Sequence, residues 1–88
     1  MLRVTKAQKE NFHAARSFAA DVLGTLKCRP LHLPSVDGEY AFTMESPDKC
    51  WVYDVFGDKN DIWKIRSQTG AEKPLEDVMN QGLVAIMH

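Results

Sequence analysis

The sequence contains no long apolar run and only two cysteines among its 88 residues. Its longest uninterrupted apolar stretch is Leu83–Met87, whereas a helix needs about 20 apolar residues to cross a bilayer. The opening residues Met1–Glu10 carry too many charges for a signal peptide. We therefore expect no membrane association and a cytoplasmic location, in which Cys28 and Cys50 remain thiols instead of forming a disulfide.

The sequence also lacks the motifs that mark common catalytic sites. It contains no glycine-rich phosphate loop, no His-Glu-x-x-His and no Gly-x-Ser-x-Gly. Ser46 and Lys49 have the Ser-x-x-Lys spacing of a serine nucleophile, but the intervening Pro-Asp is typical of a turn. Cys28 and His32 are spaced like two zinc ligands, yet no second close pair completes a four-ligand site. We expect neither an enzyme nor a bound metal or cofactor.

Positive and negative charges balance over the chain but are distributed unevenly. Eleven Lys and Arg against twelve Asp and Glu give a net charge of −1. Residues 1–30 carry six basic and two acidic groups, and residues 31–88 carry five basic and ten acidic groups. The overall balance gives no general attraction to nucleic acids. With 44% hydrophobic residues, the chain has the composition of a globular protein, and we expect a single compact domain over residues 1–88.

The first third of the chain has the pattern of an amphipathic helix. Thr5 is suited to cap its start, and Gly24 is suited to end it. At about 100° per residue, the apolar positions fall on one side: Val4, Phe12, Ala15, Phe18, Ala19, Val22, Leu23 and Leu26. We expect a helix over residues 6–23. Pro30 and Pro34 then limit residues 27–33 to a short edge strand or a connector, and Ser35–Gly38 has the composition of a turn.

Three apolar-rich runs follow, Tyr40–Glu45, Cys50–Phe56 and Asp61–Ser67, and two four-residue turn sequences separate them. This arrangement predicts an antiparallel meander of three strands, or four with the edge strand. Pro74 is placed to start a C-terminal helix that reaches the mid-eighties. Alternatively, this helix ends at Gly82 and Leu83–His88 forms a strand. The predicted fold class is α+β, with the N-terminal helix packed on the meander and the C-terminal segment closing it.

The expected register sorts the strand residues onto two faces. If both loops close symmetrically, Glu45 lies opposite Cys50 and Phe56 opposite Asp61. The first face then carries the core: Tyr40, Phe42, Met44, Trp51, Tyr53, Val55 and Ile62, with the stems of Lys64 and Arg66 at one edge. For the aromatic residues of this face, packing in the core is a better interpretation than stacking on the bases of a nucleic acid. A shift of one residue would exchange the faces of a strand.

The second face has an apolar centre surrounded by acidic residues. It is either covered by the C-terminal segment or offered to a partner. We interpret it as a surface on which aromatic anchors and carboxylates bind a basic protein partner. The predicted function is a small protein-interaction module, for which a second copy of the chain is one candidate partner. The predicted binding residues are Val52, Phe56, Trp63, Ile65, Asp48, Asp54, Asp58 and Asp61.

A basic stripe on the N-terminal helix supports an alternative function. Lys6, Lys9, His13 and Arg16 follow one another at steps of three, four and three residues. Such a stripe is suited to contact the phosphates of a nucleic acid. The other interpretation is an ordinary solvated helix face, because Glu10 lies beside it.

Overall fold

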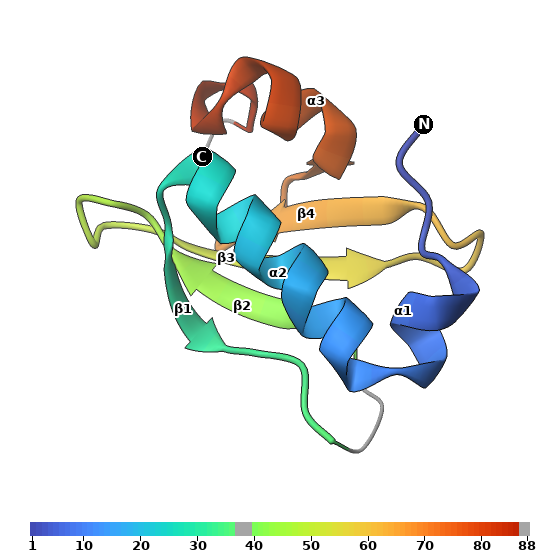
Figure 1. Ribbon diagram of the computed structural model, residues 1–88. Coiled ribbons are helices and arrows are strands. Elements are labelled where there is room, and N and C mark those ends of the chain that lie inside the picture. Colours follow the sequence, from blue (N-terminus) through green and yellow to red (C-terminus); the bar gives the residue numbers. More distant parts are fainter. Residues whose placement is uncertain (37–39, 87–88) are drawn as a thin grey trace.

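The computed structural model describes residues 1–36 and 40–86, and over these residues a layer of helices packs on one face of a five-stranded sheet (Figure 1). The elements follow in the order α1 (Lys6–Glu10), α2 (Phe12–Leu26), β1 (Arg29–His32), β2 (Phe42–Glu45), β3 (Val52–Gly57), β4 (Trp63–Ser67), β5 (Glu72–Pro74) and α3 (Leu75–Gln81). A short 3₁₀ turn, η1 (Leu83–Ala85), follows α3. The strand order is β1-β2-β3-β4-β5, and all neighbours are antiparallel. The predicted α+β fold is confirmed, with five strands in the described residues.

The N-terminal helix is divided into two helices at Asn11. Thr5 caps α1, because its Oγ1 accepts a hydrogen bond from the backbone N–H of Gln8 at 3.0 Å, and Gln8 Oε1 accepts one from Thr5 N in return. Asn11 has an extended backbone with φ −132°, and its side chain accepts a hydrogen bond from His13 N at 2.9 Å. An Asn side chain competes in this way with the helical backbone, so the prediction of one continuous helix is wrong.

The end of α2 also differs from the prediction. Gly24 lies inside the helix, and Lys27 provides the left-handed residue at its end with φ 58°. Leu26 is 7% exposed and belongs to the core. Burial of Leu26 favours one more helical turn, which outweighs the lower helix propensity of glycine.

The register of β4 decides which residues enter the core. Between β2 and β3, Glu45 lies opposite Val52, a displacement of two residues from the expected pairing that preserves the faces. Between β3 and β4, Phe56 lies opposite Lys64, a displacement of three residues that exchanges the faces of β4. The β3–β4 loop is longer than expected because Asp58 Oδ1 accepts hydrogen bonds from the backbone N–H groups of Asn60 and Ile62. The assignment of Trp63 and Ile65 to the second face is therefore wrong.

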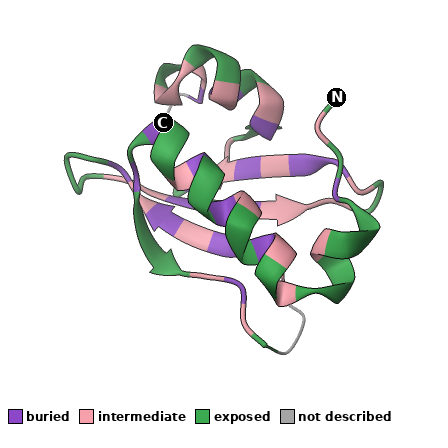
Figure 2. Ribbon diagram, viewed as in Figure 1, coloured by how far each residue is buried: buried purple, intermediate pink, exposed green. Residues whose placement is uncertain are grey.

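Both of these residues are fully buried in the core. The Trp63 ring stacks on Phe18 of α2 at 4.5 Å, meets the edge of Tyr40 at 5.6 Å, and donates from Nε1 to Gln8 Oε1 at 3.1 Å. Figure 2 shows buried residues along the strands where α2 crosses the sheet. The core joins residues of α2, α3, the covered sheet face and three positions in connecting or terminal segments. Its members are Val4, Ala19, Val22, Leu26, Cys28, Phe42, Met44, Tyr53, Val55, Trp63, Ile65, Leu75, Val78 and Ile86.

The C-terminal helix is shorter than expected. It ends at Gly82, whose φ of 87° lies in the region that favours glycine. After Gly82 the chain forms η1 instead of more helix or a strand, and Ile86 returns to the core with 1% exposure. The predictions for Asp37, Gly38, Met87 and His88 lie outside the described residues.

Candidate functional site

The sheet face that the helices leave uncovered carries charges of both signs. Its register places Thr43, Asp54, Arg66 and Glu72 in one row across neighbouring strands. Thr43 Oγ1 donates to Asp54 Oδ1 at 3.2 Å, and Arg66 Nε lies 3.8 Å from Glu72 Oε2. Such alternating cross-strand charges are typical of a solvated sheet.

Of the four apolar residues predicted for binding, Val52 and Phe56 lie on this uncovered face, and both are half-buried. The Arg66 guanidinium covers the Phe56 ring, with Cζ 4.5 Å from the ring centroid. A hollow of about 220 Å³ lies beside these residues and is bordered by His32, Thr43 and Asp54. The uncovered face is therefore polar and has a cation over its aromatic ring, whereas the prediction was an apolar centre.

The predicted acidic residues do not form one rim. Asp48 lies in the β2–β3 loop, Asp58 and Asp61 in the β3–β4 loop at the other end of β3, and Asp54 on the uncovered face. Hydrogen bonds from the backbone N–H groups of Ile62 and Asn60 lower the pKa of the Asp58 carboxyl. The ionised carboxylate therefore stabilises the conformation of its own loop. Asp61 forms an ion pair with Lys9.

The basic stripe is shared between two helices. Lys6 and Lys9 belong to α1, His13 and Arg16 belong to α2, and all four are exposed. The pairing of Lys9 with Asp61 neutralises one of these charges. Contact with nucleic acid through this stripe stays a prediction.

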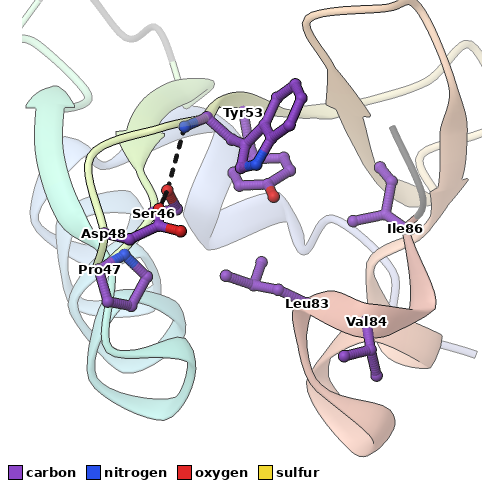
Figure 3. Close-up of a pocket in the computed structure, with 8 residues that line it drawn as sticks. Ser46, Pro47, Asp48, Tyr53, Leu83, Val84 and Ile86 are labelled. Carbon is purple, nitrogen blue, oxygen red and sulfur yellow. Dashed lines mark hydrogen bonds between the residues drawn. The ribbon is translucent and has the colours of Figure 1, made fainter.

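A larger hollow lies between the β2–β3 loop and the C-terminal turn (Figure 3). Its volume is about 380 Å³, and its walls are mostly apolar. The residues that line it are Ser46, Pro47, Asp48, Trp51, Tyr53, Leu83, Val84 and Ile86. We call this hollow the C-terminal pocket.

Two segments far apart in the sequence build the C-terminal pocket. Tyr53 and Ile86 form its buried part, with 2% and 1% exposure, while Val84 is 76% exposed at its edge. In Figure 3, Leu83 and Ile86 extend from the C-terminal segment into the space that faces Tyr53 and the loop. This juxtaposition was not predicted from the sequence, because it depends on the chain turning at Gly82. The glycine itself was the available signal.

The loop side of the pocket is held by a small hydrogen-bond network. Ser46 Oγ donates to Asp48 Oδ1 and accepts from Trp51 N at 3.1 Å. Asp48 Oδ1 also accepts from Cys50 N at 3.0 Å. These hydrogen bonds, the one from Ser46 above all, lower the pKa of the Asp48 carboxyl, which therefore stays ionised at neutral pH. Burial raises the pKa of Tyr53, so its hydroxyl stays neutral.

The thiols have different environments. Burial raises the pKa of the Cys28 thiol to about 11, which makes it a poor nucleophile. Cys50 is exposed, and the two thiols are not joined. Over residues 1–36 and 40–86, no three His, Cys, Asp or Glu side chains are placed to share a metal ion.

Comparisons of the chain with protein-family models, with curated proteins and with solved structures found no match. None of the helices in the described part of the chain has both the length and the apolar character needed to cross a bilayer.

Proposed function

We propose that the protein is a small non-enzymatic binding module that holds one large apolar side chain of a protein partner in the C-terminal pocket. The observation that carries this proposal is the hollow of about 380 Å³ walled by Trp51, Tyr53, Leu83 and Ile86. Its volume lies in the lower part of the range of about 300–1,000 Å³ that is usual for ligand sites. Aromatic and aliphatic pockets of this kind receive the anchor residues that dominate many protein interfaces.

The exposed edge of the pocket supports a protein ligand. Val84 is 76% exposed, and Pro47 is exposed on the opposite loop. A partner chain that passes over the pocket would cover this apolar rim, which a ligand confined to the hollow would leave in water. We place this module in the cytoplasm, where Cys28 and Cys50 stay reduced.

The sheet edges are poorly suited to a different mode of binding, the addition of a partner strand. Edge strand β1 contains Pro30, which has no N–H to donate, and its pairing is irregular between Pro30 and His32. The other edge strand, β5, has three residues and ends at Pro74. Short edges with proline protect a sheet against further strands, which supports the pocket as the docking site.

A selection from a phage-displayed library of random short peptides tests the proposal. We expect the enriched peptides to share one large apolar residue. Titration with these peptides should shift the indole N–H signal of Trp51 in a ¹H–¹⁵N spectrum and leave that of Trp63, which is bonded to Gln8, in place.

The matched variants are Val84→Lys at the rim and Phe56→Ala on the uncovered sheet face. Val84→Lys should abolish peptide binding, because an ionised group is placed at the apolar mouth, and Phe56→Ala should not affect it. If Phe56→Ala abolishes binding and the Val84 variant does not, the docking surface is the uncovered sheet face instead of the pocket. If no peptide is enriched, and sedimentation shows a dimer that Val84→Lys abolishes, the occupant of the pocket is a second copy of the chain instead.

A further inference from the structure

The C-terminal pocket has one charged group in its lining. Of the described residues that form it, Asp48 alone carries a charge, and the other seven are apolar or neutral. The ion pairs of the described residues do not include Asp48. Within residues 1–36 and 40–86, the carboxylate therefore places a negative charge without an ion-pair partner beside an apolar hollow.

The geometry of this carboxylate is fixed by the loop. Oδ1 accepts the hydrogen bonds from Ser46 Oγ and Cys50 N, and these leave Oδ2 as the oxygen that a ligand can approach. A carboxylate held in this way needs little ordering when a cation binds. Aromatic walls beside it also favour a cation, through the negative faces of their rings.

From this arrangement we infer that the partner segment carries a basic residue next to its apolar anchor, and that this residue pairs with Asp48 Oδ2. The inference rests on the proposed function. A two-pronged guanidinium contact needs both carboxylate oxygens. Because Oδ1 already accepts two hydrogen bonds, we expect a lysine to bind Asp48 as well as an arginine does.

The experiment uses the tightest peptide enriched on the 88-residue chain, remade with Lys, Arg, Gln or Glu at the position beside its anchor. At low salt, the Lys and Arg peptides should bind about two- to fivefold more tightly than the Gln peptide, as expected for a partly exposed ion pair. The Glu peptide should bind more weakly than the Gln peptide. These differences should shrink as salt is added.

Two variants test whether Asp48 is the group that causes the preference for a basic peptide residue. Asp48→Asn removes the charge but keeps an oxygen that can accept from Ser46 and Cys50, so the loop is preserved and the preference for Lys should vanish. Asp58→Asn makes the same change in the loop at the other end of β3 and should leave the preference intact.

The possible failures are distinguishable. If the Lys, Arg, Gln and Glu peptides bind equally while Val84→Lys still abolishes binding, the inference is overturned and the pocket remains the docking site. If the preference for Lys survives Asp48→Asn, another group provides it and the inference is overturned. If no peptide perturbs Trp51, both proposals fall.

Discussion

The two tryptophans of the chain have opposite environments, although each stands at the start of a run of alternating strand residues. Trp63 is fully buried, stacks on Phe18 and donates to Gln8. Trp51 is half-buried and lines the C-terminal pocket. Tryptophan thus lies inside the core at one position, whereas at the other it packs against the core and forms part of the pocket wall.

Replacement of each tryptophan by phenylalanine measures this difference. Trp63→Phe should lower the free energy of unfolding by about 2–3 kcal/mol, because a hydrogen bond is lost and a void is left in the core. Trp51→Phe should cost less than about 1 kcal/mol, since solvent or small movements fill the space. Urea unfolding followed by circular dichroism gives both values. Similar costs at the two positions would contradict the burial of Trp63.

At the scale of the elements, Asn11 joins the two N-terminal helices. It is the C-cap of α1 and the N-cap of α2, and its side chain accepts from His13 N. The position of α1 follows from this break. α1 brings Gln8 to the Trp63 indole, and residues 2–4 lie along the start of β4 through hydrogen bonds of Val4 N to Asp61 O and Trp63 N to Leu2 O.

Asn11→Ala should therefore lower the free energy of unfolding by about 1 kcal/mol, the usual cost of a lost N-cap. Asn11→Asp keeps the accepting oxygen. Its negative charge is favourable at the N-terminus of α2 and unfavourable at the C-terminus of the five-residue α1, so it should cost less than Asn11→Ala. Thermal unfolding of the three proteins under one set of conditions makes the comparison. An Asn11→Ala variant as stable as the wild type would show that the break does not depend on this cap.

Apolar spacing and turn residues are local signals, and they predict the helical N-terminal segment, strands β2, β3 and β4 in their order, and the helix after Pro74. They did not predict the division at Asn11 or strand β5. The face of β4 could not be predicted. It depends on the parity of the β3–β4 loop, which the Asp58 hydrogen bonds and the left-handed Asp61, with φ 59°, set together. One odd displacement moves Trp63 and Ile65 from the expected surface into the core.

The candidate site was less predictable than the fold. Asp48 was predicted as a binding residue. Trp51 and Tyr53 were predicted as core residues, which is correct for Tyr53, but their place in the pocket wall was not predicted. The pocket arises because α3 stops at Gly82 and the next residues turn back toward the β2–β3 loop. Contacts between residues 46–53 and residues 83–86 join segments far apart in the sequence. They depend on tertiary packing, which local patterns do not encode.

At the scale of the whole molecule, the chain has one layer of helices and one sheet, so a single core supports the fold. This core contains two ionisable side chains, Cys28 and Tyr53, and burial raises the pKa of both. Each is neutral in the folded protein at neutral pH. Their titration therefore makes the free energy of unfolding of the whole domain decrease at alkaline pH.

Stability should fall as pH rises through the range in which the unfolded chain loses protons that the folded chain keeps. For Cys28 the thiol pKa rises from 9.0 to about 11, so its contribution is complete below pH 9 and is lost progressively up to about pH 11. Tyr53 acts in the same direction. Cys28→Ala removes the thiol but retains all other titrating groups, so the difference in pH dependence between the two proteins isolates Cys28. Urea unfolding at intervals across this range should give a shallower loss for the variant; parallel curves would contradict a buried, neutral Cys28.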